Sequence, residues 1–264
     1  HWDWNVVDHY ALDARWESAL RASTRQIMVI DDSAGRQHDC DVLLDQNYYA
    51  DMRSRYEGKV PAHCQQLLGP RFALLREEFR KLREHAKPRT GSVKKILVFF
   101  GGVDAANYTS LAIQALAAIG NKALHIDVVI GAQHPYREQI QQACVEQGYV
   151  CHVQTTRIAE LMAAADMAIG AGGSANWERC AMGLPSLIMV LAENQNKAAI
   201  DLAATGVLIN LGDARLIMKT DLIRAIDKLL VDEQLRTELS NASLRLVPMS
   251  EQSELAEIMN GNYV

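Results

Sequence analysis

The sequence predicts an α/β protein made of two doubly wound domains, the first of them incomplete. Short apolar runs alternate with helical patterns along the whole chain of 264 residues. The apolar runs are continuous, which is typical of parallel strands that are buried on both faces of a sheet. A polar Pro/Gly stretch at 87–92 interrupts the alternation and indicates a domain boundary. We therefore expect one domain over residues 1–88 and a second over residues 89–264.

The elements follow from hydrophobic periodicity and from the turn residues between them. The expected strands are the runs at 5–8, 26–31, 42–44, 95–100, 125–130, 150–154, 167–169, 186–190 and 207–210. The expected helices lie at 13–23, 71–85, 109–119, 135–147, 158–165, 175–182, 194–204, 219–230 and 233–246. From residue 94 onward these elements make a complete doubly wound domain. Residues 1–88 hold fewer strands than such a domain of about 100 to 150 residues needs, so we expect the first domain to lack its N-terminal part.

The composition favours a soluble, cytoplasmic protein that binds neither nucleic acid nor membrane, and we expect it to be a monomer. The net charge is −5, and acidic and basic residues are mixed along the chain. The longest apolar runs, at 96–100 and 184–192, are too short to cross a bilayer. The five cysteines are odd in number and contain no C-x-x-C pair, which favours reduced thiols over a disulfide framework.

Two clusters of potential metal ligands occur, but neither predicts a metal site. The segments 38–41 and 151–152 combine histidine, cysteine and aspartate. Neither has a second ligand cluster at the spacing that zinc sites use. We therefore expect no metal and no cofactor.

The most informative segment is the glycine-rich loop Gly170–Ser174, between an expected strand and an expected helix. Glycines lack Cβ and let backbone N–H groups approach phosphate oxygens, and the helix N-terminus adds partial positive charge. Glu178 lies one turn after Ser174, so its carboxylate could accept hydrogen bonds from two ribose hydroxyls. We interpret Gly172, Gly173 and Ser174 as a diphosphate-binding loop and Glu178 as a ribose-binding residue. The alternative is that the glycines only permit tight packing.

Two further loops follow strands that end at the same edge of the expected sheet. One contains Gly101 and Gly102, and the other contains Asn194 and Gln195. Ligands of open α/β sheets bind outside the carboxyl ends of the strands, so the three loops together favour one ligand site. The two amides suit the acetamido and hydroxyl groups of a sugar, although Asn194 could simply cap the next helix. Asp104 is interpreted as a helix cap.

The first domain offers candidate catalytic residues at the end of its opening strand. Asp8 could anchor this loop, while His9 or Tyr10 faces the ligand; a histidine here could equally be structural. Asp31 and Asp32 end the next strand. Paired carboxylates suit acid–base chemistry or a metal, but ordinary turn chemistry is the favoured interpretation.

With these residues in place, the chain resembles the UDP-2,4-diacetamido-2,4,6-trideoxy-β-L-altropyranose hydrolases of pseudaminic acid biosynthesis, a pathway of flagellin glycosylation. The resemblance rests on 6–13, 30–32 with Arg36, His38 and 40–41, on 69–70, 74–76 and Phe79, and on 100–104, 170–178, 183–185 and 194–195. It covers nearly the whole chain. The glycine loop, Glu178 and the Gly-Leu-Pro segment at 183–185 are shared more widely with the related MurG-like glycosyltransferase that adds N-acetylglucosamine in peptidoglycan synthesis.

The resemblance implies a GT-B fold of two Rossmann-like domains with the active site between them. The second domain would bind UDP, with 172–174 on the diphosphate, Glu178 on the ribose, and Asn194 and Gln195 toward the sugar. The first domain would supply the chemistry, with Tyr10 near the reacting sugar. Water would break the anomeric C–O bond without a metal, and UDP would be the leaving group.

The sequence departs from the family in one respect. The family's proposed general base is a histidine in a Gly-x-Gly-His-type loop near the N-terminus, and this sequence contains no such loop. The resemblance does not transfer that role to His9. We therefore expect a truncated hydrolase that binds UDP but has lost turnover. The alternatives are a UDP-sugar glycosyltransferase of GT-B type and a non-catalytic nucleotide-sugar-binding module.

Overall fold

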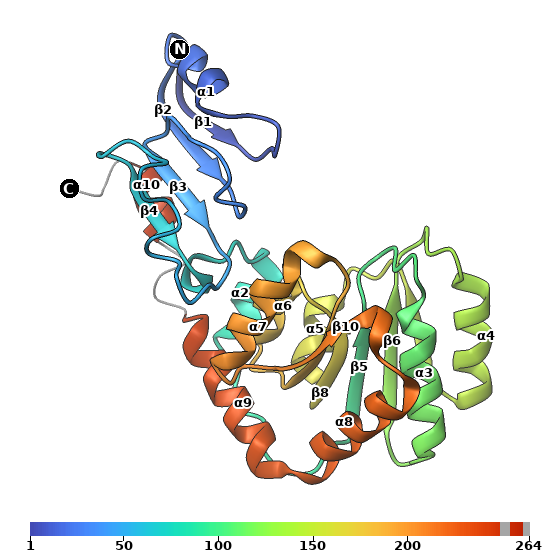
Figure 1. Cartoon of the computed structure of the whole chain (residues 1–264). Coiled ribbons are helices and arrows are strands. Elements are labelled where there is room, and N and C mark those ends of the chain that lie inside the picture. Colours follow the sequence, from blue (N-terminus) through green and yellow to red (C-terminus); the bar gives the residue numbers. More distant parts are fainter. Residues whose placement is uncertain (249–253, 261–264) are drawn as a thin grey trace. The chain divides into compact units, whose positions relative to one another are not determined.

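The computed structural model describes residues 1–248 and 254–260, and the chain folds as two compact units (Figure 1). Unit 1 comprises residues 1–74 together with the segment from 247 onward, and unit 2 comprises residues 75–246. The expected boundary at residue 88 therefore differs from the observed one. The reason is packing: helix α2 (Glu77–Arg83) contacts the helices of unit 2, whereas Ile258 of helix α10 (Glu254–Met259) joins a core cluster of unit 1.

Unit 1 contains a parallel sheet of four strands in the order β1-β2-β3-β4. The strands are β1 (Trp2–Val7), β2 (Thr24–Ile30), β3 (Val42–Asp45) and β4 (Gln65–Leu68), with helix α1 (Ala14–Leu20) between the first two. Strand β4 was not expected, because it begins with two glutamines and carries little apolar signal. It forms because its backbone pairs in parallel with β3, with Val42 opposite Gln65.

Alternate residues of these strands face two separate apolar clusters. Ile27, Val29 and Leu43 pack on one face together with the fully buried Tyr56. Met28, Val42 and Leu44 pack on the other face, where Ile258 of α10 covers them. The indole Nε1 of Trp4 donates to the carbonyl of Met259 at 2.9 Å, which attaches α10 to β1.

Unit 2 contains a six-stranded parallel sheet in the order β10-β9-β8-β5-β6-β7. The strands are β5 (Lys95–Phe99), β6 (His125–Ile130), β7 (Val150–Val153), β8 (Met167–Ala171), β9 (Ser186–Val190) and β10 (Ile209–Asp213). The helices are α3 (Tyr108–Ile119), α4 (Arg137–Gln147), α5 (Ile158–Ala164), α6 (Ala175–Ala181), α7 (Asn196–Ala204), α8 (Lys219–Val231) and α9 (Glu233–Leu246). This order is that of a complete Rossmann-like domain, and it reverses between β5 and β8.

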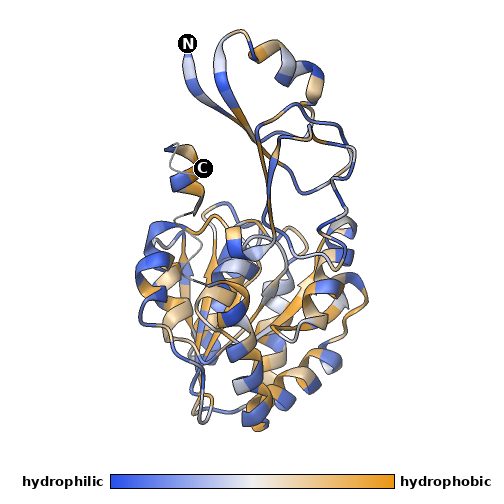
Figure 2. Ribbon diagram, turned by 90° about the vertical axis from the view of Figure 1, so that its left-hand side faces the viewer, coloured by the Kyte–Doolittle hydropathy of each residue, from blue (hydrophilic) through white to orange (hydrophobic). Residues whose placement is uncertain are grey.

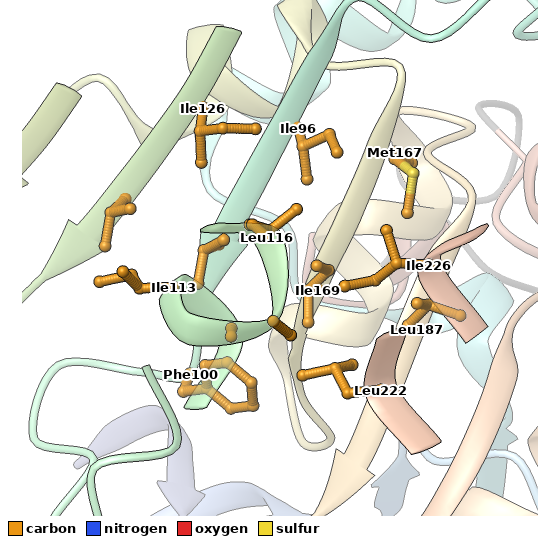
Figure 3. Close-up of a cluster of buried hydrophobic side chains, with 14 of the residues drawn as sticks. Ile96, Phe100, Ile113, Leu116, Ile126, Met167, Ile169, Leu187, Leu222 and Ile226 are labelled. Atoms are coloured by element: carbon orange, nitrogen blue, oxygen red, sulfur yellow. The ribbon is translucent and has the colours of Figure 1, made fainter. Parts of the chain in front are cut away.

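The core of unit 2 lies between the sheet and its helices (Figure 3). Ile96, Ile169 and Leu187 project from three strands toward α3 and α8, which contribute Leu116 and Ile226. Burying each such side chain contributes about 1.5–3 kcal/mol. Figure 2 shows the apolar strands at the centre and hydrophilic residues on the outer sides of the helices. Among the described residues, no helix is long and apolar enough to span a membrane.

The expected helix at 71–85 is divided into two elements. Residues Pro70–Phe72 form a 3-10 helix, and α2 starts at Glu77. Extended backbone at Ala73 (ψ 130°) and Arg76 (ψ 151°) interrupts the helix between them. This break places Arg76 at the N-terminus of α2.

Candidate functional site

The loops after β5 and β8 leave the sheet on either side of the point where the strand order reverses. Phe99 at the end of β5 pairs with Gly170 in β8, so the two loops start at neighbouring positions on the carboxyl edge. In open α/β sheets this position is where ligands bind. The expected convergence of the loops containing Gly101–Gly102 and Gly172–Gly173 at one edge is therefore present in the structure.

The residues of the glycine-rich loop have different roles. Gly170 belongs to β8, and a Cβ there would lie 2.1 Å from the carbonyl oxygen of Phe99, so this glycine serves close strand packing. The N–H of Gly172 donates to the carbonyl of Met189 at 3.1 Å. Gly173 has a φ of +95°, a conformation that favours glycine. Packing, the alternative interpretation, thus holds for Gly170.

Three backbone donors at this turn remain available for a ligand. Within the described part of the chain, no hydrogen bond uses the N–H groups of Gly173, Ser174 or Ala175. Ser174 is exposed, and its side chain does not cap α6. Consecutive unpaired N–H groups at a strand-to-helix turn form an anion-binding arrangement.

Gln195 lies against this loop. The Cβ positions of Gly172 and Gly173 would lie 3.6 Å from Gln195 Oε1 and Nε2 respectively, so the amide is in van der Waals range of the loop. Gln195 Oε1 is shielded from solvent and accepts no hydrogen bond from the described residues. The side chain of Asn194 lies outside the described residues, and its backbone belongs to the 3-10 helix Glu193–Gln195.

Glu178 lies one turn into α6 and is paired with Arg76. Arg76 Nε and Nη2 both contact Glu178 Oε1, at 3.0 Å and 2.9 Å, and Arg76 also pairs with Glu78 at 3.0 Å. Burial raises the pKa of Glu178, and the charge of Arg76 opposes that shift. Sequence reasoning missed this partner, because the two residues are 102 positions apart and no local pattern connects them.

The second glycine pair holds two loops together. Gly102 accepts a hydrogen bond from Gly131 N at 3.0 Å, and a Cβ on Gly131 would lie 2.3 Å from the Gly102 oxygen. Gly101 has a φ of +96° and open space around its Cβ position. The N-cap of α3 is Asn107, so the interpretation of Asp104 as the N-cap is wrong. Asp104, three residues earlier, still stabilises the first turn of α3, because it accepts from the backbone N–H and the hydroxyl of Thr109, each at 2.7 Å.

In unit 1, Tyr10 contacts Asp32. The Tyr10 hydroxyl donates to Asp32 Oδ1 at 3.0 Å, and Asn47 Nδ2 donates to Asp32 Oδ2 at 3.2 Å. The hydrogen bond to Asp32, followed by burial and nearby carboxylates, raises the pKa of Tyr10. Tyr10 is therefore a neutral donor at neutral pH. His9 Nδ1 accepts a hydrogen bond from Ala11 N at 3.0 Å, so Nε2 is the ring nitrogen of this exposed side chain that remains for a ligand. Asp8 is exposed as well.

The adjacent carboxylates Asp31 and Asp32 have separate surroundings. Burial opposes ionisation of Asp31, but hydrogen bonds from Arg36, Ala34 and Ser33 hold its pKa below the usual value. The bonds from Ala34 and Ser33 agree with the turn interpretation for Asp31. The half-buried Asp32 faces Tyr10, which no pattern in the sequence indicated.

Comparisons with known proteins agree with this architecture. The model of the glycosyltransferase family 28 C-terminal domain matches residues 95–259. The spore coat polysaccharide biosynthesis protein SpsG of Bacillus subtilis is 27% identical over 227 residues, which are 84% of this chain and 65% of SpsG. The UDP-2,4-diacetamido-2,4,6-trideoxy-beta-L-altropyranose hydrolase of Campylobacter jejuni is 26% identical over 202 residues, 76% of this chain and 71% of that protein. The chain thus spans about two thirds of the SpsG length.

The crystal structure of Acinetobacter baumannii MurG shares the fold. It aligns with a TM-score of 0.64 at 15% identity, over 97% of this chain and 74% of MurG. The expected α/β class with two Rossmann-like units of GT-B type is confirmed. Since the family model covers more than half of the residues, the chain belongs to the glycosyltransferase family 28 C-terminal domain family.

Proposed function

We propose that this chain is a UDP-sugar-processing enzyme and that it hydrolyses a UDP-linked diacetamido-trideoxy sugar to UDP and the free sugar, as pseudaminic acid biosynthesis requires. One observation carries the proposal. The glycine turn at the reversal point of the sheet carries the unpaired N–H groups of residues 173–175 and contacts the amide of Gln195, and Glu178 follows in the first turn of α6. The name of the Campylobacter jejuni relative supports the choice of substrate and reaction.

Each group at this turn suits one part of a UDP-sugar. The three N–H groups would bind the diphosphate. Glu178 would accept hydrogen bonds from the ribose hydroxyls. Gln195 Oε1, a shielded acceptor without a donor among the described residues, would accept from an acetamido N–H or a hydroxyl of the sugar. Further contacts to the sugar and the phosphates would come from Asn194, Gly101 and Gly102.

Unit 1 would provide the reacting groups. Tyr10 would accept a hydrogen bond from a substrate hydroxyl or N–H through its phenolic oxygen, because its own O–H is donated to Asp32 and its raised pKa keeps the phenol protonated. The Asp8 carboxylate is the exposed group of this loop that can accept a proton, whereas Nε2 of His9 carries the ring N–H, because Nδ1 accepts from Ala11, and can donate a hydrogen bond. Water would form a bond to the anomeric carbon while the anomeric C–O bond breaks and UDP leaves.

The reaction can be tested with the UDP-diacetamido sugar in ¹⁸O-labelled water. We expect UDP without label, because attack at the anomeric carbon places the water oxygen on the sugar. Labelled UDP would mean attack at phosphorus and would contradict the proposed bond cleavage. UDP binding without turnover would contradict hydrolysis by this chain. That outcome would fit both the loss of turnover expected from the sequence and the nucleotide-sugar-binding module.

The second candidate is glycosyl transfer to an acceptor sugar. The family match over residues 95–259 and the fold shared with MurG favour it. UDP release that depends on an added acceptor, with a glycosylated product detected by mass spectrometry, would establish transfer in place of hydrolysis.

A further inference from the structure

Arg179 lies in α6 directly beneath the glycine loop. Its residue exposure is only 2%, and Nη2 donates to the carbonyl of Ala171 and to Asn176 Oδ1, both at 2.6 Å. The position of a Cβ on Gly170 would be 3.3 Å from Arg179 Nη1. The guanidinium therefore packs beside the two residues that lead into the loop.

Arg179 forms no ion pair in the part of the chain that the structure describes. No carboxylate there lies within ion-pair distance of the guanidinium, and Nε is buried without an acceptor. The neighbouring Glu178 offsets part of the Arg179 charge electrostatically, but its carboxylate is paired with Arg76 through Oε1. The acceptors on Ala171 and Asn176 are neutral, so they satisfy hydrogen bonds but do not neutralise the cation. Burial lowers the pKa of Arg179, but an arginine remains charged at neutral pH.

An unbalanced buried cation is costly unless an anion compensates it. The unpaired N–H groups of Gly173, Ser174 and Ala175 are able to hold an anion, and they lie in the chain between Ala171 and Asn176, the two residues that the guanidinium contacts. A charge in a low-dielectric interior acts over longer distances and is screened less by salt than an exposed charge.

We propose that Arg179 is the buried cation of the diphosphate site: its charge increases the affinity of the loop for phosphate without direct contact, and so favours nucleoside diphosphates over nucleosides. This inference rests on the proposed nucleotide site. Arg179 is thus an electrostatic positioning residue. The competing interpretation is that it only holds the loop through its hydrogen bonds to Ala171 and Asn176.

The test compares UDP, UMP and uridine as ligands of the wild-type chain and of Arg179→Gln, by calorimetry and, for weak ligands, by ligand-observed NMR. We expect the UDP affinity to fall by about tenfold or more, the UMP affinity to fall less, and the uridine affinity to stay within about twofold. Arg224→Gln is the matched control, because it removes an exposed cation from α8 and should leave all three affinities unchanged. Thermal unfolding without ligand establishes that each variant is folded.

An equal loss for all three ligands in folded Arg179→Gln would overturn the inference and leave Arg179 a scaffold of the loop. If Arg179→Gln does not fold, Arg179→Lys decides, because lysine keeps the charge and changes the hydrogen-bond geometry. Retention of the wild-type ratio of UDP to uridine affinity in that variant supports a charge effect, and its collapse refutes one. A wild-type chain that does not bind UDP would refute the proposed function itself, whereas one that binds UDP and uridine equally would refute only the role of Arg179.

Discussion

Two guanidinium nitrogens of Arg76 contact one carboxylate oxygen of Glu178: Nε donates a hydrogen bond to Oε1 at 3.0 Å, and Nη2 forms an ion pair with the same oxygen at 2.9 Å. Glu178 is largely buried, with 17% of its side chain exposed, whereas half of the Arg76 side chain is exposed. The pair therefore fixes the orientation of the carboxylate and supports its ionised form against the effect of burial. Oε2 accepts no hydrogen bond from the described residues and remains free for a ligand hydroxyl.

The first prediction concerns ribose recognition by Glu178. We expect Glu178→Gln to weaken UDP binding by about tenfold, because a hydrogen bond to a charged group contributes about 1.5–3 kcal/mol. The affinity for 2′,3′-dideoxy-UDP should not change, because this ligand has no hydroxyls to donate. Calorimetry with both ligands provides the measurement, and the exposed Glu160→Gln on α5 is the control. Equal losses for both ligands would assign Glu178 a structural role.

The second prediction concerns the pH dependence of binding. Ribose hydroxyls donate to the ionised carboxylate, so UDP affinity should fall as pH falls through the pKa of Glu178, which burial raises. Removal of the Arg76 charge in Arg76→Ala should raise that pKa further and move the loss of affinity to higher pH. The dissociation constant of UDP is measured from about pH 4 to pH 8, the range in which a raised carboxyl pKa is expected.

The β-phosphate of UDP also titrates in this range, and Glu178→Gln provides the correction because it retains only the ligand's titration. If Arg76→Ala and the wild-type chain have the same pH midpoint after this correction, Arg76 does not tune Glu178.

The third prediction concerns the packing role of Gly170. A Cβ there would lie 2.1 Å from the Phe99 carbonyl, and neither backbone can move without disturbing the pairing of β5 and β8. We expect Gly170→Ala to lower the free energy of unfolding by about 3 kcal/mol, measured by urea denaturation. Gly172→Ala is the control within the same loop, because its Cβ would contact nothing closer than 3.6 Å and should change stability by less than about 1 kcal/mol. Similar stability of the two variants would show that the strands separate readily.

The fourth prediction concerns Tyr10. Tyr10→Phe removes the hydroxyl that donates to Asp32, and 70% of the residue is exposed, so stability should change by less than about 1 kcal/mol. We expect turnover of the UDP-sugar to fall by about tenfold, because loss of one hydrogen bond to the reacting sugar raises the barrier by about 1.4 kcal/mol. The affinity for UDP should not change, because its binding groups lie in unit 2. Tyr48→Phe in the same unit is the control. Equal turnover of the two variants would show that Tyr10 takes no part in the reaction.

Much of the fold could be predicted because strand and helix formation depend on local patterns. Three elements have the expected bounds: the strands at 125–130 and 186–190 and the helix at 233–246. In each of them a continuous apolar run or a helical period ends at clear turn residues. Strand β4 could not be predicted, because its two glutamines are stabilised by pairing with β3 and by no property of the segment itself.

The sequence by itself determined the α/β class and the loops at the carboxyl edge, including the glycine turn and Glu178. Only the tertiary structure decided what each residue does there. Gly170 serves strand packing, Arg76 pairs with Glu178 from 102 residues away, and the charge of Arg179 is buried beneath the loop. The physical reason is that backbone preferences are local, whereas ion pairs, close approaches and burial depend on which distant segments the folded chain brings together.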